Sequence, residues 1–494
     1  MLYYKVNVLI TTIAPLFGLS GSATVSSTAF QTINGIGASG AWWPLDIYSF
    51  SDEVKNNVSE LLFGREALSM TSYRYNIGGG GVHVGTIGRA PETMYISPGV
   101  YNWSADPQGS YFLRAASDHG VAILTAFVNS APPAFTSNNR SCGGTLVNAS
   151  IPNYATYIVD IVHHWREEGV HINFISPMNE PDNGFNSGDE LCGQEGMIVE
   201  PNQRAAVVTT LRRTLDAAGL KEVGIMADES SSYGTFTADA PSWLSSAGPS
   251  LSAVSHHQYG FANNAQDMAL GQTARNLSGG VPSWFSEICC FVARDESQPF
   301  GALNYGGRYD PTIVSALQTG GLVYQAFTQA QDEHFDWWLS ASSGLGCDPL
   351  SDVSCPYEIN ADGWNDGLIY YDSNFATNSN FGVYLTKRYF LFKHFTWFIP
   401  PGAVRHAVSG LPSTVNALAF TLPSGEFKWT IIAMNLSNST TAFEIILPEA
   451  LVASRAFRTS ALEDWVRVDD MVAVSGAILS VHLAELSITS VVLL

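Results

Sequence analysis

Apolar and polar positions divide the chain into two regions with different periods. Before about residue 394, short apolar runs alternate with stretches in which apolar residues recur every three or four positions. Short runs of this kind predict buried strands, and the longer spacing predicts amphipathic helices. From about Phe395 the period becomes two, which predicts strands joined by turns. The pattern therefore predicts an α/β region followed by an all-β region.

Eight strand-like runs precede the change of period, and helical stretches connect most of them. One helix is predicted after Ser51, which is a good N-cap, and it should end at Gly64. Repeated strand–helix units imply parallel strands, and eight such strands close a barrel. The runs lie around Gly37 and over residues 68–77, 121–128, 171–175, 222–226, 253–259, 282–288 and 334–339.

We therefore predict a (β/α)8 TIM barrel over residues 35–394 and an attached β-sandwich domain over residues 395–494. Because a barrel is already closed, the all-β domain should pack outside it. A strand-like run over residues 24–34 precedes the barrel. We expect this N-terminal strand to join the C-terminal sheet and so to tie the two ends of the chain together.

The first 23 residues are predicted to be a secretory signal peptide. Lys5 precedes an apolar run over residues 6–19, and Gly21, Ser22 and Ala23 are small enough for a cleavage site. The run is too short and too interrupted for a membrane span, and no other stretch reaches about 18 uninterrupted apolar residues. We expect a secreted, extracellular protein without an integral membrane anchor.

Sequons and cysteines agree with export. Seven Asn-X-Ser/Thr sequons predict a glycosylated product, and six cysteines should largely pair in an oxidising compartment. The cysteine spacing fits no zinc pattern. The sequons begin at Asn57, Asn102, Asn139, Asn148, Asn276, Asn435 and Asn438. The expected disulfide pairs are Cys347 with Cys355 and Cys142 with Cys192. Cys289 and Cys290 are either buried free thiols or a vicinal bridge.

Composition limits the classes of partner. The chain has 494 residues, of which 46% are hydrophobic and 14% charged, so it can bury a large core. A net charge of −21 argues against nucleic acid and anionic membranes as partners. Aromatic residues reach 12%, and surplus tryptophan suits clefts in which sugar rings stack on indole rings. We expect a monomer without a cofactor.

Two glutamates at the ends of separate apolar runs form the main candidate site. Glu180 stands in Asn179-Glu180-Pro181, where the proline prevents the strand from continuing. Glu287 ends the run that begins at Pro282. The separation of 287 − 180 = 107 residues equals about three βα units of roughly 30 to 35 residues. The spacing places the two carboxyl groups on opposite sides of the barrel mouth.

Opposed carboxyl groups suggest a glycosidase. Two carboxyl groups about 5 to 5.5 Å apart cleave glycosidic bonds with retention, one as nucleophile and the other as acid and then base. The acid needs a raised pKa, and the nucleophile must stay ionised. Arg74 and Tyr259, at the tips of two other strands, are the candidates to hold the nucleophile.

The ordered motifs resemble those of glycoside hydrolase family 30, in the clan of retaining (β/α)8 glycosidases. The resemblance rests on Asn-Glu-Pro, the later Ser286-Glu287, residues 73–79, residues 129–133 and the split β-domain, and it is closest to fungal secreted members such as endo-β-1,6-galactanases. It implies that Glu180 is the acid/base and Glu287 the nucleophile. It further implies substrate contacts for Asn179 and orientation of the nucleophile by Arg74 and Tyr259.

Further substrate contacts are expected near the strand tips. Trp42, Trp43 and Trp338 are candidates for stacking on sugar, although each can equally be a core residue. Asn129 and His257 are further candidates. We expect no metal, because a histidine here is more often a satisfied residue at the barrel mouth and no set of acids completes a metal site.

We predict a secreted retaining glycanase that cleaves a β-linked cell-wall polysaccharide, with β-1,6-galactan, β-1,6-glucan and xylan as candidates. The alternative enzyme is an exo-acting glucosidase of the glucosylceramidase type, for which a blind pocket would argue. The alternative outside the enzymes is a non-catalytic carbohydrate-binding protein. The paired glutamates argue against a mere binder, because binding alone needs no opposed carboxyl groups.

Overall fold

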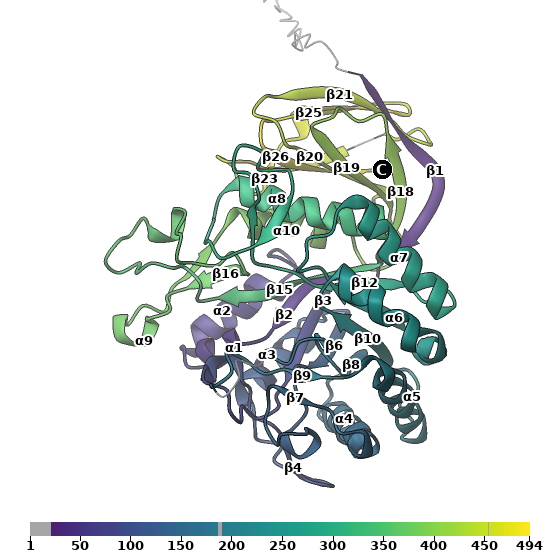
Figure 1. Ribbon diagram of the computed structural model, residues 1–494. Helices are drawn as coiled ribbons and strands as arrows, with labels where there is room; N and C mark the ends of the chain where they lie inside the picture. The colour runs from purple at the N-terminus through teal and green to yellow at the C-terminus, as the bar shows by residue number, and fades with distance from the viewer. Residues whose placement is uncertain (1–20, 186–189, 453) are drawn as a thin grey trace, which may run out of the picture.

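Eight parallel strands form a closed barrel in the computed structural model, which describes residues 21–185, 190–452 and 454–494 (Figure 1). The barrel closes because the last strand pairs with both the first strand and the seventh. The predicted TIM barrel is thus confirmed, and all eight predicted runs contribute a strand. In order, the strands are β2 (Gly35–Gly40), β3 (Ser72–Ile77), β6 (Ile123–Val128), β8 (Phe174–Ser176), β10 (Gly224–Ser230), β11 (Ala253–His257), β12 (Ser283–Glu287) and β15 (His334–Ser342).

The first strand is rich in glycine because it lies against its neighbour with no space for side chains. A Cβ atom at Gly37 would lie 1.9 Å from the carbonyl oxygen of Ser72 in β3, and one at Gly40 would lie 1.7 Å from the Tyr73 hydroxyl. Larger residues would therefore push β2 away from β3. This close approach keeps Ser39 and the Arg74 of β3 beside each other at the barrel mouth.

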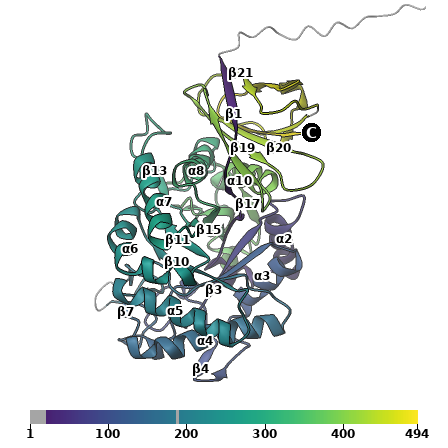
Figure 2. The same cartoon turned by 90° about the vertical axis from the view of Figure 1, so that its right-hand side faces the viewer.

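Helices surround the barrel and bury one apolar face each. In α4, Tyr154, Ile158, Ile161 and Trp165 recur at helical spacing and are all buried. Figure 2 shows α4, α5, α6 and α7 in succession along one side. The longer helices are α2 (Asp52–Phe63), α3 (Pro107–Asp118), α4 (Ile151–Glu167), α5 (Pro201–Ala217), α6 (Tyr233–Ala247), α7 (Asn264–Ser278), α8 (Ile313–Gln325) and α10 (Lys387–Phe398).

Shorter elements extend the loops around the barrel mouth and its rim. A hairpin of β16 and β17 continues the barrel sheet beyond β15, and a second hairpin of β13 and β14 follows the seventh barrel strand. These elements are α1 (Trp43–Ile47), β4 (Tyr95–Ser97), β5 (Val100–Tyr101), β7 (Gly144–Thr145), β9 (Met197–Ile198), β13 (Phe291–Ala293), β14 (Leu303–Tyr305), β16 (Gly367–Tyr371), α9 (Phe375–Asn378) and β17 (Val383–Leu385).

The C-terminal strands form a separate sheet, which also includes the N-terminal strand β1 (Ser22–Thr32). β1 pairs antiparallel with β18 and parallel with β21, as the sequence predicted. Strands far apart in the sheet order, such as β20 and β25, contact each other, so the sheet folds into two layers. The other strands are β18 (Val404–Ser409), β19 (Val415–Thr421), β20 (Trp429–Asn435), β21 (Thr441–Ile446), β22 (Ser454–Thr459), β23 (Val466–Arg467), β24 (Val472–Ser475), β25 (Ile478–Leu483) and β26 (Ser487–Leu493).

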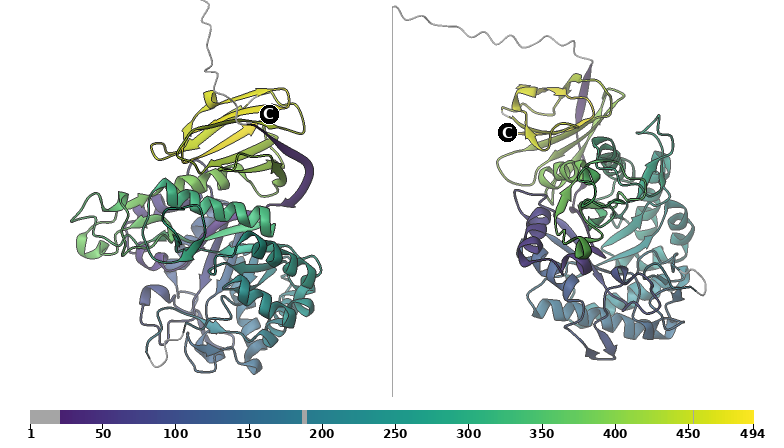
Figure 3. Two further views of the ribbon diagram at one scale, coloured as in Figure 1. Left: turned by 45° about the horizontal axis from the view of Figure 1, so that its top comes forward. Right: turned by 90° about the vertical axis from the view of Figure 1, so that its left-hand side faces the viewer.

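The β-domain lies at one end of the molecule, outside the barrel, as two further views show (Figure 3). Helices α8 and α10 separate it from the barrel strands and contact β19, β20 and β26. The approach is close, since a Cβ atom at Gly320 of α8 would lie 2.4 Å from the Met434 sulfur. His394 of α10 is buried between Ser490 and Thr459, and burial lowers its pKa to about 3. The interface therefore contains a neutral imidazole with both nitrogens hydrogen-bonded.

Three disulfides join the cysteines in the predicted pairs, and Cys289 and Cys290 form the vicinal bridge. The predicted signal peptide lies almost entirely outside the described residues, although Ser22 and Ala23 belong to β1 and pair with β21. The predicted domain boundary at residue 395 falls within α10, whose last residue is Phe398. In the described part of the chain, no helix combines the length and the apolar character that a membrane crossing requires.

Candidate active site

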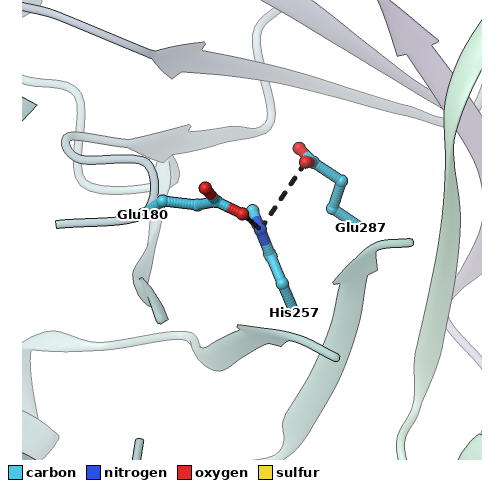
Figure 4. Close-up of side chains that lie close together, drawn as sticks. All are labelled: Glu180, His257 and Glu287. Atoms are coloured by element: carbon cyan, nitrogen blue, oxygen red, sulfur yellow. Dashed lines mark hydrogen bonds and ion pairs between the residues drawn. The ribbon is translucent and has the colours of Figure 1, made fainter. Parts of the chain in front are cut away.

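Glu180 and Glu287 meet at the C-terminal mouth of the barrel. Glu287 is the last residue of β12, and Glu180 follows the end of β8 by four positions. Both are buried, with exposed fractions of 5% and 3%. Figure 4 shows that the two side chains approach from different sides and that the imidazole of His257 lies between them. One oxygen of each carboxyl group and a His257 nitrogen lie within 4.8 Å of one another.

Irregular strand ends turn these side chains toward the barrel axis. In β11 and β12, His256 pairs with Phe285 but His257 pairs with Glu287, so Ser286 is an extra residue. Such a bulge changes the direction in which the following side chain points. A register shift also occurs in β10 at Glu229, whose φ of 66° is uncommon for a residue other than glycine. The barrel thus departs from regular strand geometry where its functional side chains project.

Two donors hold the Glu287 carboxylate. Arg74 Nη1 lies 2.8 Å from its Oε2 atom, and the Tyr259 hydroxyl lies 2.8 Å from its Oε1 atom. Arg74 is fully buried and also contacts the oxygens of Ser39 and Asn179. Burial and the charge of Glu287 raise the pKa of Tyr259 well above its usual value, so the phenol stays protonated and donates. Each Glu287 oxygen therefore accepts a hydrogen bond from one of these two residues.

Glu180 lies in an environment that favours its protonated form. Burial is the main cause of its raised pKa, and the nearby charges of Glu287 and Asp182 act in the same direction. The hydrogen bond between Glu180 Oε1 and His257 Nδ1, at 3.1 Å, opposes this shift. Glu180 therefore lies where its protonated form is favoured, whereas Glu287 accepts hydrogen bonds from Arg74 and Tyr259.

His257 bridges the acidic groups as a cation. Its Nε2 atom lies 3.0 Å from Glu229 Oε2, and its Nδ1 atom contacts Glu180. Burial lowers the pKa of His257, but Glu287, Glu180 and Glu229 outweigh it and raise the pKa to about 10. A metal ligand must offer the lone pair of a neutral imidazole. The spacing of Glu180, His257 and Glu287 would suit a metal ion, but a protonated His257 favours an ion-pair network instead.

Glu229, near the end of β10, is a further member of this network, and no sequence motif marks it. It is fully buried and contacts Arg74 Nη2 at 3.4 Å and the Ser286 hydroxyl. Burial raises its pKa, but Arg74, His257 and Ser286 outweigh burial and lower the pKa to about 2. Its neighbour Asp228 instead pairs with Arg204 at 2.7 Å. Glu229 does not line the cavity. Its contacts with Arg74 and His257 therefore hold these two side chains in position rather than contact a substrate.

A cavity of about 390 Å³ opens over the two glutamates. Trp42 and Trp338 form part of its wall, with ring centroids 5.0 Å apart and planes at 87°. Four of the predicted residues, Asn179, Tyr259, Trp42 and Trp338, therefore line the same cavity as the glutamates. Cys289 and Cys290 also line the cavity, next to the Ser286-Glu287 motif. The sequence did not single out several other lining residues, because their loops carry no motif; they are Arg89, Tyr305, Trp364 and Asp366.

Three predicted contact residues, Trp43, Asn129 and His257, do not line this cavity; His257 instead lies against Glu180 and Glu229. Trp43 is buried in the core, where its ring packs on Phe112 at a centroid distance of 4.4 Å. Asn129 is 1% exposed and follows β6, and its amide has no hydrogen-bond partner in the described part of the chain. Trp43 is the first residue of helix α1 and points into the core, whereas Trp42 precedes the helix with a φ of 65° and lines the cavity.

Comparison with known proteins identifies a family. The sequence profile of "O-Glycosyl hydrolase family 30" matches residues 23–350. A xylanase C catalytic domain of that family from Talaromyces cellulolyticus superposes with a TM-score of 0.71 at 21% identity, covering 96% of this chain and 100% of that one. A conserved exported protein from Bacteroides fragilis gives 0.78 at 19% identity, with coverages of 95% and 100%. An endo-β-1,6-glucanase gives 0.66 at 16% identity, with coverages of 95% and 94%. At these identities the similarity concerns the fold.

Proposed function

The chain belongs to O-glycosyl hydrolase family 30, and from this premise we propose that it cleaves β-glycosidic bonds of a polysaccharide with retention of configuration. The observation that carries the proposal is the spacing of Glu180 and Glu287, whose facing carboxyl oxygens lie within 4.8 Å. Retaining enzymes place their carboxyl groups about 5 to 5.5 Å apart, whereas inverting enzymes need about 6.5 to 9.5 Å to admit a water molecule.

In the first step, Glu287 attacks the anomeric carbon and Glu180 gives its proton to the leaving oxygen. A bond forms between the Glu287 carboxylate and the sugar, and the glycosidic bond breaks. Glu180 becomes a carboxylate at this point, and the cationic imidazole of His257 at 3.1 Å stabilises the new charge. The raised pKa of Glu180 keeps the proton available until the transition state needs it.

In the second step, Glu180 acts as a base. It removes a proton from a water molecule, whose oxygen attacks the anomeric carbon as the bond to Glu287 breaks. Glu287 leaves as a carboxylate, and Arg74 and Tyr259 again hold its two oxygens. Glu180 finishes with its proton restored, so the pair returns to its starting state. Two inversions at one carbon give net retention.

Exposed aromatic residues at the rim of the cavity favour an enzyme that cleaves bonds within a polymer chain. Tyr305 is 57% exposed and Trp364 is 37% exposed, and their ring centroids lie 6.1 Å apart beside the catalytic residues. Exposed aromatic faces of this kind stack on sugar rings beyond the reacting one. We therefore favour an endo-acting glycanase, with β-1,6-galactan, β-1,6-glucan and xylan as the candidate polymers.

A polymer with acidic substituents is a second candidate, and Arg89 favours it. Its guanidinium lies on the cavity wall, 4.2 Å from the centroid of the Trp42 ring. Arg89 ends a short helical turn over Ile87–Arg89 in the loop after β3, and no sequence motif marks it as a site residue. Asp366 lies on the same wall and offsets part of this charge. A screen that pairs each neutral polymer with glucuronoxylan separates the two substrate classes.

The stereochemistry of the first product tests the proposal. Nuclear magnetic resonance of a hydrolysis reaction should show the β-anomer of the new reducing end before mutarotation. Early release of the α-anomer would contradict the proposed roles of the two glutamates. Chain lengths of the products distinguish endo from exo action, because exo action releases only short products of uniform length.

Export and glycosylation complete the proposal. The three disulfides are typical of an oxidising compartment. Six of the seven predicted sequons carry an exposed asparagine, which is accessible to a bulky glycan. The exception is Asn435, which is fully buried and donates to the carbonyl oxygens of Ser439 and Ala484. We infer a secreted glycoprotein in which Asn435 is unmodified.

A further inference from the structure

We propose that a second cavity, outside the barrel, binds a short neutral saccharide. It has a volume of about 650 Å³ and lies between the outer face of β11 and β12, the helices α7 and α8, and a loop of the β-domain that includes Ser413. Figure 2 shows α7, α8 and β13 on the same side of the molecule, next to the β-domain. This cavity shares no lining residue with the catalytic cavity.

Buried polar side chains form one wall of this second cavity. His256, Gln258 and Asp332 have exposed fractions of 1%, 4% and 0%. Gln258 Nε2 donates to Asp267 Oδ1 at 3.0 Å, and His256 Nε2 lies 3.2 Å from Asp332 Oδ1. These contacts fix the orientation of the side chains before any ligand arrives. Such preorganisation lowers the entropy cost of binding.

The same side chains retain unused hydrogen-bonding capacity. Gln258 Oε1, Asp332 Oδ2 and His256 Nδ1 are buried and have no partner among the residues that the structure describes. A buried polar atom without a partner costs about 1–3 kcal/mol, so such atoms are rare unless something satisfies them. Three of them on one cavity wall indicate a place where a ligand supplies the missing bonds.

The chemistry of these atoms selects the class of ligand. Two of them are oxygens that only accept hydrogen bonds, and the nitrogen also accepts when His256 donates its Nε2 proton to Asp332. The ligand must therefore carry several donors. The carboxyl groups of Asp267 and Asp332 disfavour an anion. Hydroxyl groups on a neutral molecule satisfy both conditions.

The rest of the lining suits a sugar ring. Phe261, Phe300 and Leu303 bring apolar surface to the same cavity, and such surface packs against the C–H face of a pyranose. A volume of 650 Å³ lies within the range of about 300 to 1,000 Å³ that is usual for small-molecule sites. The choice of a saccharide rests in part on the proposed function, since the substrate of a glycanase is present wherever it acts.

Gly321 provides a variant that fills the cavity without removing any of its polar groups. It lines the cavity on α8, and a Cβ atom at this position would meet no atom within 4 Å. Gly321→Trp should therefore fold and occupy the space that a ligand needs. Gln258→Leu is the complementary variant, because it removes one acceptor. Gln272→Leu, at an exposed position of α7 outside the cavity, is the matched control.

The experiment is calorimetric titration of the Glu287→Gln protein, which cannot turn over, with xylobiose, gentiobiose and β-1,6-galactobiose. We expect that at least one disaccharide binds at one more site per protein molecule than the catalytic cavity provides. The additional site is the second cavity. Gly321→Trp and Gln258→Leu should each remove one binding equivalent, and Gln272→Leu should remove none. Polymer hydrolysis by Gly321→Trp in the otherwise wild-type protein should stay unchanged.

The proposal fails if all variants bind the same number of equivalents, or if only ammonium or an amine buffer occupies the site in a parallel titration. It also fails if Gly321→Trp retains the second binding equivalent with the wild-type affinity. Failure of the proposed function has a different signature. In that case no polymer is hydrolysed by the wild-type protein, while Gly321→Trp still loses one equivalent.

Discussion

Arg74 Nη1 lies 2.8 Å from Glu287 Oε2, although 213 positions separate the two residues along the chain. Arg74 comes from the second barrel strand and Glu287 from the seventh, so only closure of the barrel brings them together. The contact supports the nucleophile role that we propose for Glu287, because the buried guanidinium holds one of its carboxyl oxygens in a fixed position. Glu180 has no arginine partner among the described ion pairs, and burial raises its pKa.

Glu180→Gln should lower kcat on the natural polymer by about 10²- to 10⁴-fold, because general acid catalysis contributes factors of this size. The loss should shrink for an aryl glycoside whose leaving group needs no proton. Steady-state kinetics on both substrates measures the difference. Glu190→Gln, at an exposed loop position, is the control and should retain full activity. Equal losses on both substrates would show that Glu180 is not the acid.

Tyr259→Phe should lower kcat/KM by about 10- to 150-fold, since a hydrogen bond to a charged group contributes about 1.5–3 kcal/mol. The hydroxyl that is removed lies 2.8 Å from Glu287 Oε1, and the ring remains to fill its place. Tyr305→Phe removes a hydroxyl from the rim of the same cavity and should change KM only slightly. Wild-type kinetics of the Tyr259→Phe protein would show that the Tyr259 hydroxyl does not orient Glu287.

His257→Asn should move the basic limb of the kcat/KM profile to higher pH. The acid must be protonated, so activity falls as the pH rises through the pKa of Glu180. His257 lowers that pKa through its hydrogen bond and charge, and its removal therefore raises it further. Activity at the optimum should also fall, because the cation no longer stabilises the Glu180 carboxylate. His171→Asn, at an exposed position, should leave the profile unchanged. A downward shift would contradict the assignment.

Glu229→Gln should destabilise the fold by about 3–5 kcal/mol at neutral pH, because it removes the carboxylate that pairs with both buried cations, Arg74 and His257. The pKa of Glu229 is lowered to about 2 in the folded protein. Its contribution is therefore complete above the pKa of the unfolded chain and is lost as the pH falls toward 2. Chemical denaturation at pH 7 and pH 3 should show a smaller difference between variant and wild type at pH 3. Glu222→Gln is the exposed control.

Glycopeptide mapping of the secreted protein should find Asn435 unmodified. Its side-chain amide donates to two backbone carbonyls and has no exposed surface, so a glycan cannot be accommodated after folding. Asn438, three positions later, is exposed and serves as the internal comparison. A glycan on Asn435 would mean that the turn after β20 differs from the one described, or that modification precedes folding of the β-domain.

The sequence alone was sufficient for the barrel, its number of strands and the position of Glu180 and Glu287 at strand ends. Strands that are buried on both faces leave continuous apolar runs, and helices between them leave a period near 3.6, so both can be read locally. Helices α6 and α7 were not individually predicted. Pro241 interrupts the pattern of α6, which packing of Phe236, Trp243 and their neighbours nevertheless holds in place. In α7, Asn263 and Gln266 form a capping box that was a usable signal.

Only the tertiary structure determined which side chains of the site contact each other and which of them line the cavity. The sequence places Glu180, Glu287, Arg74 and Tyr259 at strand ends, because strand ends follow from local pattern. It does not contain the bulges at Glu229 and Ser286 or the choice between Trp42 and Trp43, since these depend on how strands pair across the barrel. Protonation follows the same rule: a glutamate becomes an acid or a nucleophile through the charges and burial that folding places around it.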